Sequence, residues 1–166
     1  MLALLLVVAL SLTPLPQASG APAQDPLATR GAQGMGFDQD KTTHHFRLYE
    51  DGGAIEVTVK EAADETNLAA IRSHLPHIAM LFGQGQFDLP HFIHATDVPG
   101  TADMTRLREK IRYRYVEAPQ GGRVDIVTTD PDALRAVHAF LAFQISDHKT
   151  GDATTVGRRP GGPPAP

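Results

Sequence analysis

The chain repeats one pattern of strand, glycine turn, strand and helix, and this repeat restricts the fold more than any other feature. In the first copy, apolar and polar residues alternate over residues 42–50 and again over residues 55–60, on either side of Gly52-Gly53. Alternation with a period of two predicts strands, and a glycine pair between two strands predicts a β-hairpin. Apolar residues then recur every three or four positions over residues 68–82, which predicts an amphipathic helix.

The second copy follows the same plan. Residues 111–115 and 124–126 alternate around Gly121-Gly122, and Asp130-Pro131 predicts the start of a second helix, because Asp caps a helix and Pro fits its first turn. A lone hairpin cannot bury its apolar face. We therefore expect an α+β fold, in which a duplicated ββα unit forms a four-stranded, mostly antiparallel sheet covered by two helices.

The second predicted helix has apolar residues on more than one face. Leu134, Leu141 and Ile145 form one stripe, and Phe140 and Phe143 lie beside it. Exposed aromatic rings need a cover, which is either the intervening segment of residues 87–110 or a second subunit. A homodimer is expected on this ground.

The two ends of the chain differ from its middle. Residues 1–23 open with an apolar run that is followed by Pro and small residues, which is typical of a secretory signal peptide. We expect a periplasmic or secreted protein with no stable membrane span after the signal is removed. Residues 24–40 are expected to be a flexible lead-in, residues 41–149 a single α+β domain, and residues 150–166 a disordered tail rich in Gly and Pro.

Composition excludes several classes of function. There is no cysteine, which rules out thiolate chemistry, disulfides and Cys-ligated zinc. The net charge of −4 gives no basic field for a nucleic acid. HExxH, GxSxG, GxGxxG and phosphate-loop motifs are also missing, so the sequence favours a non-catalytic role.

Histidine is the one chemically distinctive residue type, with eight copies, all between His44 and His148. His74 and His77 are helix neighbours three positions apart, His44 lies on the inward face of the first strand, and the loop bearing His94 returns over the helix. We expect these four to bind a transition metal, copper or zinc. Imidazole suits these ions in a compartment without thiols, and a thioether is available from Met35, Met80 or Met104.

The other histidines have simpler interpretations. His45, His91 and His148 are expected to be solvated surface residues, and His138 to be a hydrogen-bonded core residue. Two alternatives to metal binding stay open: a small-ligand or haem-binding module with a histidine as axial ligand, and a metal-dependent enzyme of unknown reaction.

Three segments resemble a family of small secreted, histidine-rich bacterial proteins: Lys41-Thr42-Thr43-His44-His45-Phe46, His74-Leu75-Pro76-His77-Ile78-Ala79 and residues 143–152. The similarity covers residues 30–152. Members of that family sometimes carry the name aspartate carbamoyltransferase. A carbamoyltransferase needs a Ser-Thr-Arg-Thr loop for carbamoyl phosphate, which this chain lacks, so the resemblance implies no catalytic residue.

Overall fold

The computed structural model describes residues 26–161, so the predicted signal peptide over residues 1–23 lies outside the described residues. Four strands form one antiparallel sheet in the order β1-β2-β4-β3: β1 (Thr42–Tyr49), β2 (Gly52–Val59), β3 (Ile111–Ala118) and β4 (Gly121–Thr128). The helices are α1 (Pro26–Met35), α2 (Glu65–Gly83), α3 (Asp88–His94), α4 (Thr101–Arg106) and α5 (Pro131–Asp147), with a 3₁₀ turn, η1 (Arg108–Lys110).

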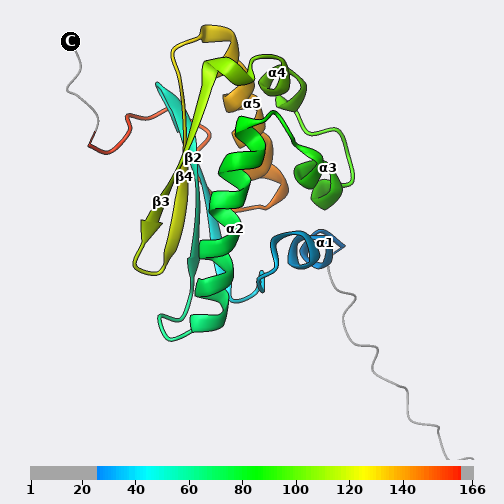
Figure 1. The fold of residues 1–166 in the computed structure, drawn as a ribbon, viewed down its shortest axis with the longest axis vertical. Coiled ribbons are helices and arrows are strands. Elements are labelled where there is room, and N and C mark those ends of the chain that lie inside the picture. The colour runs from blue at the N-terminus through cyan, green and yellow to red at the C-terminus, as the bar shows by residue number, and fades with distance from the viewer. Residues whose placement is uncertain (1–25, 162–166) are drawn as a thin grey trace, which may run out of the picture.

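The predicted α+β fold is confirmed. The two long helices, α2 and α5, lie on the same face of the sheet (Figure 1), and each follows one of the two hairpins in the chain. The hairpins meet through β2 and β4, so the sheet is continuous across both halves. Apolar side chains of all four strands and both helices make up the core between these layers.

The glycine pairs do not form the hairpin turns. Those turns are Glu50-Asp51 and Pro119-Gln120, and the glycines open the strands that follow. Gly53 and Gly122 face the helices at very short range. A Cβ on Gly53 would lie 2.2 Å from Leu141 Cδ1 of α5, and one on Gly122 would lie 3.1 Å from Leu75 Cδ1 of α2. Glycine thus lets each helix approach the sheet closely.

Phe140 is covered within the chain. It is 2% exposed, and its ring lies 5.8 Å from that of Phe82 and 6.0 Å from that of Phe87. Phe143 is partly buried and packs on His94, with 5.0 Å between ring centroids. The segment of residues 87–110 therefore supplies the cover, and these rings give no reason to expect a second subunit.

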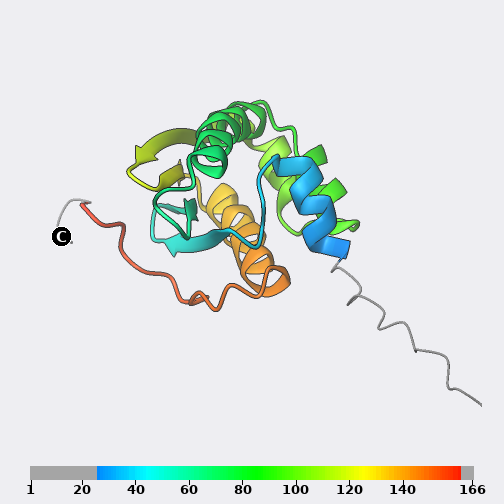
Figure 2. The same ribbon diagram turned by 90° about the horizontal axis from the view of Figure 1, so that it is seen from below.

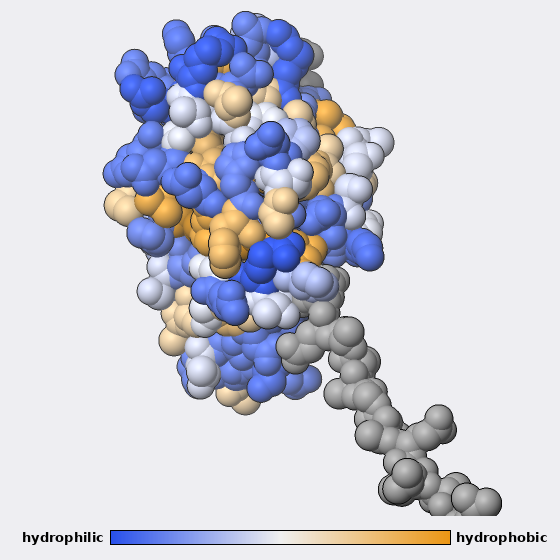
Figure 3. All heavy atoms as spheres, turned by 90° about the vertical axis from the view of Figure 1, so that its right-hand side faces the viewer, coloured by the Kyte–Doolittle hydropathy of each residue, from blue (hydrophilic) through white to orange (hydrophobic). Residues whose placement is uncertain are grey.

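The expectation of a flexible lead-in over residues 24–40 is wrong for residues 26–35, which form α1. This helix packs on α3 through Gly34: a Cβ there would lie 2.7 Å from Leu89 Cδ1. Arg30 also donates a hydrogen bond to the Ile93 carbonyl, at 2.7 Å. Glycine is a poor helix former, so tertiary packing rather than propensity stabilises α1. Apolar side chains gather in the middle of the face formed by α1 and α3 (Figure 3).

The expectation of a disordered tail is also wrong for residues 150–161, while residues 162–166 lie outside the described part. This segment, which we call the strap, leaves α5 and runs along the side of the sheet away from the helices (Figure 2). Gly157 exchanges backbone hydrogen bonds with Leu48 and Glu50 at the edge of β1. Polar and backbone contacts hold the strap, and hydrophobic periodicity cannot reveal such contacts.

Two charged side chains anchor the strap. Asp152 accepts hydrogen bonds from the Phe46 amide and from Arg47. Arg159 bonds to Asp51 and to Asp125, a carboxylate that is only 2% exposed, and lies over the Tyr49 ring at 4.7 Å. Within residues 26–161, no helix has the length and apolar character that a membrane crossing requires.

Replacing Arg159 by Leu should lower the free energy of unfolding by about 2 kcal/mol, because a buried carboxylate loses a charged hydrogen-bond donor. Urea denaturation measures this change. The control is Arg106→Leu, since the one salt bridge of Arg106 within residues 26–161 is with Asp103, an exposed neighbour one helical turn away, and its loss should cost less than about 0.5 kcal/mol. Equal stability of the two variants would show that the contacts of Arg159 contribute nothing to stability.

Candidate functional site

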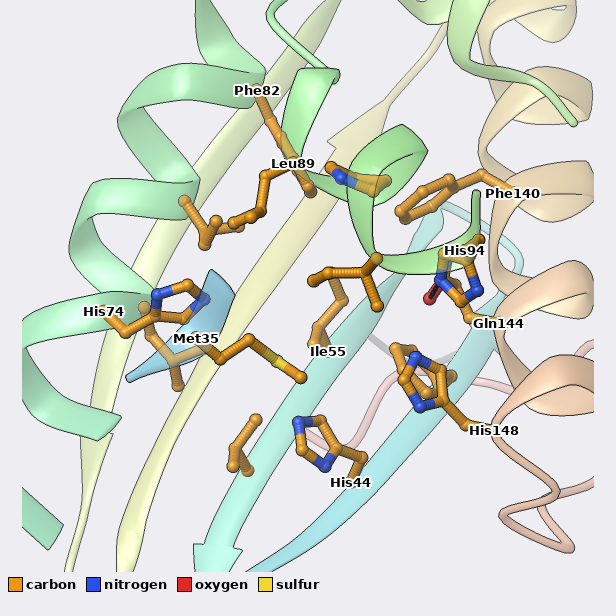
Figure 4. A pocket seen from close by; sticks show the side chains of 16 residues that line it. Met35, His44, Ile55, His74, Phe82, Leu89, His94, Phe140, Gln144 and His148 are labelled. Atoms are coloured by element: carbon orange, nitrogen blue, oxygen red, sulfur yellow. Dashed lines mark hydrogen bonds between the residues drawn. The ribbon is translucent and has the colours of Figure 1, made fainter. Parts of the chain in front are cut away.

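A partly open cavity of about 60 Å³ lies between α2 and α5, over the inward face of β1 and β2. Figure 4 shows α2 on one side, α5 on the other, and the strands β1 and β2 behind. Most of the lining is apolar, and four histidines from four different elements interrupt it. These are His44 of β1, His74 of α2, His94 of α3 and His148, which caps the C-terminus of α5.

Local structure explains how each ring reaches the cavity. His44 alternates with His45 along β1, so it shares the inward face with Phe46. His74 lies one position before Leu75, a buried residue of α2, at the flank of the buried stripe. His94 ends α3, where Ala95 takes a left-handed conformation with φ of 52°. Met35, the last residue of α1, adds a thioether to the lining.

His44 is the most unusual of the four. Its Nε2 atom is buried and has no hydrogen-bond partner among the described residues. The ring lies 5.6 Å from the ring of His148, with 10° between their planes, and 5.7 Å from that of Phe37. Burial, and then the neighbouring charge of His148, lowers the pKa of His44 to about 3. The ring is therefore neutral at physiological pH.

Two further rings are neutral for the same reason. Burial is the largest cause that lowers the pKa of His74 to about 4, followed by the charge of His77. Burial, and then the charge of His94, also lowers the pKa of His148 to about 4. An apolar cavity thus holds three imidazoles, each of which keeps a lone pair on one ring nitrogen.

His94 has no free ring nitrogen. Its Nδ1 lies 2.5 Å from Asp147 Oδ2, and its Nε2 lies 3.0 Å from Gln144 Oε1, the contact drawn as a dashed line in Figure 4. The Gln144 amide nitrogen is buried without a partner among the described residues. His94 therefore shapes the wall of the cavity, and His44, His74 and His148 remain as groups that can meet a ligand.

The structure brings together three of the four predicted metal ligands, His44, His74 and His94. The fourth, His77, does not join them: His74 already lies at the flank of the buried stripe of α2, and His77 lies farther from that stripe, exposed and outside the cavity lining. Of the candidate thioethers, Met35 lines the cavity, whereas Met80 is 50% exposed and Met104 is buried elsewhere.

The prediction that His148 is a solvated surface residue is wrong. It follows Ile145 by three positions, so it continues the buried stripe of α5 by one more turn, which is the signal that identifies it. The remaining histidines have structural partners. His45 bonds to Asp152, His91 to Thr96 and Thr101, and His138 to the carbonyls of Tyr49 and Gly52, as expected for a hydrogen-bonded residue.

The arrangement of possible metal ligands and the volume of the cavity restrict what the site can hold. Over residues 26–161, no three His, Asp or Glu side chains form a group that could hold a metal ion. The cavity volume of about 60 Å³ is well below the roughly 300 Å³ of the smallest pockets for drug-sized ligands. The cavity thus has room for a few heavy atoms, and a haem would need far more space.

Stability should fall as the pH drops from 6.5 to 5. The pKa values of His44, His74 and His148 are lowered in the folded state, so the unfolded chain binds more protons below its own imidazole pKa of 6.5. Their contribution is complete above pH 6.5 and decreases by up to about 1.4 kcal/mol per pH unit for each ring. Urea denaturation at several pH values measures the slope. A flat profile would mean that the rings are solvated.

Replacing His44 by Phe should raise the free energy of unfolding by about 1 kcal/mol, because a ring of similar shape then replaces a buried nitrogen without a partner. The substitution should also remove the contribution of His44 to the pH dependence of the free energy of unfolding. The matched control is His77→Phe, an exposed position on α2, where neither quantity should rise. A loss of stability in His44→Phe would show that Nε2 has a partner in solution.

No protein-family model, curated protein or solved structure matches the chain.

Proposed function

We propose that the protein binds a small, mainly apolar molecule in the cavity, and that this ligand places one polar atom on His44 Nε2. The observation that carries the proposal is the buried Nε2 without a partner. Leaving such a group unsatisfied costs roughly 1–3 kcal/mol, and buried polar groups are rarely left so. A ligand with a hydroxyl or carbonyl group recovers this free energy when it binds.

The lining supports binding rather than covalent chemistry. Apolar side chains of the helices and strands offer contact to a hydrocarbon body, and the neutral rings offer one or two hydrogen bonds. The lining of this cavity has no hydroxyl, thiol or carboxylate to serve as a nucleophile. We further propose that the protein acts in the periplasm or outside the cell, as the apolar run of residues 1–12 suggests.

A soft metal ion is the second candidate. His44, His148 and the thioether of Met35 line the same cavity, and neutral imidazole and thioether are the donors that Cu(I) prefers. A monovalent ion with few ligands also suits an apolar site better than a hydrated dication. In this version of the copper proposal, His148 replaces His77 as a ligand, and zinc becomes less favoured because zinc prefers four ligands.

Primary alcohols from butan-1-ol to octan-1-ol test the first candidate. Each added methylene should strengthen binding about fourfold, because burying it is worth about 0.8 kcal/mol, until the chain fills the cavity and the gain stops. Nitrogen-detected NMR of the histidine rings measures affinity and shows whether the His44 signals shift. His44→Phe should lower the affinity for every alcohol by a similar factor, while His77→Phe should bind the alcohols as tightly as the natural protein does.

A separate titration tests the metal candidate. Anaerobic titration with Cu(I) should give one tight site that both Met35→Leu and His44→Phe weaken, if copper is the ligand. Binding of alcohols without Cu(I) binding supports the first candidate, and the reverse result supports the second. If neither probe binds, the cavity is structural and both candidates are wrong.

A further inference from the structure

A second hollow lies on the other side of His44 and His148. This outer cleft has a volume of about 380 Å³ and is lined by the same two rings together with polar residues of β1 and of the chain after α5. Leu27, Gln39, Lys60 and Asp147 complete the lining. We propose that the ligand is a short amphiphile with a carboxylate head, whose hydrocarbon chain lies in the cavity and whose head lies in the outer cleft. This inference rests on the proposed function and names its ligand class.

The position of the two rings is the first step. His44 and His148 line both hollows, so together they form the wall between them. Their rings are stacked, with 10° between planes and 5.6 Å between centroids. A ligand that enters from the cleft therefore passes or contacts these rings, and an imidazole N–H at this wall can donate to a head group.

The charges of the cleft are the second step. Lys60 and Lys149 line it and are exposed, and within residues 26–161 neither has a carboxylate oxygen within 4.0 Å of its ammonium nitrogen. The Lys60 ammonium donates one hydrogen bond, to the Asp40 carbonyl at 2.8 Å. One carboxylate, that of Asp147, also lines the cleft, and it is paired with His94. Both ammonium groups therefore keep N–H donors for an anion.

The backbone of Lys149 is the third step. Its φ of 52° lies in the left-handed region, at the position after a helix where glycine is usual. A side chain at this position strains the backbone, and here it places an ammonium group in the lining of the cleft. The partial negative charge at a helix C-terminus favours a cation at this position. A cation elsewhere in the last turn would have the same favourable interaction without the backbone strain.

The carboxylate is the head group that these residues fit best. Lysine binds anions as a point charge, and the cleft offers two such charges. The cleft has no arginine to grip a phosphate through two parallel hydrogen bonds. A chain of a few carbons suits the small cavity behind the wall.

Hexanoate and hexan-1-ol form a matched pair of probes, because they share a chain and differ in the head group. Isothermal titration at pH 7.5 and low salt should show that hexanoate binds roughly fivefold more tightly, as expected for two exposed charge contacts. Added salt should remove this advantage by screening. The double variant Lys60→Gln, Lys149→Gln should also remove it and leave the affinity for hexan-1-ol unchanged.

The control is Lys110→Gln, which changes net charge by one unit in the 3₁₀ turn η1, a segment that does not line the cleft. It should retain the preference for hexanoate. If hexan-1-ol binds as well as hexanoate, or if the double variant retains the preference, the head group does not lie in the cleft and only this inference fails. If neither probe binds, while the protein is folded, the proposed function fails as well.

Discussion

The close approach of the two long helices to the sheet governs the rest of the architecture. Helix α5 rests on Gly53, where a Cβ would collide with Leu141, and helix α2 rests on Gly122, where a Cβ would lie only 3.1 Å from Leu75. Between these two contacts the sheet carries full side chains, Ile55 and Val57, which line the floor of the cavity. The cavity is thus the space left where two helices are held down at their glycine contacts and no side chain fills the gap between them.

The fold could be predicted from the sequence because it depends on periodic burial. Two hairpins and two amphipathic helices each need a partner, and a single sheet with both helices on one face satisfies all of them. The glycine pairs were correctly associated with the hairpins, but their physical role is packing rather than turning. Helix α1 and the strap escaped prediction because glycine contacts, backbone pairing and the charges of Asp152 and Arg159 leave no periodic signal.

The site could be predicted only in part. Inward alternation placed His44 correctly, and the helix flank placed His74, since both positions follow from local geometry. His148 was missed because the apolar stripe of α5 was taken to end at Ile145. His77 lies on the exposed side of α2, so it does not converge with the other three, although it is the helix neighbour of His74. The unpartnered nitrogen of His44 could not be foreseen, since it depends on every neighbour that packs around the ring.

Successive residues of β1 serve opposite sides of the sheet. His44 faces the cavity, while His45 and the Phe46 amide bind Asp152 on the other side, only four residues after His148 in the chain. Residues 44–46 of β1 therefore connect the cavity wall to the anchor of the strap, and residues 148–152 connect the same two places at the end of α5. Together they form a closed circuit through β1, α5 and the strap. A change in the spacing of the two stacked rings must be absorbed by this circuit, so the carboxyl-terminal segment is mechanically coupled to the wall of the cavity even though it does not line it.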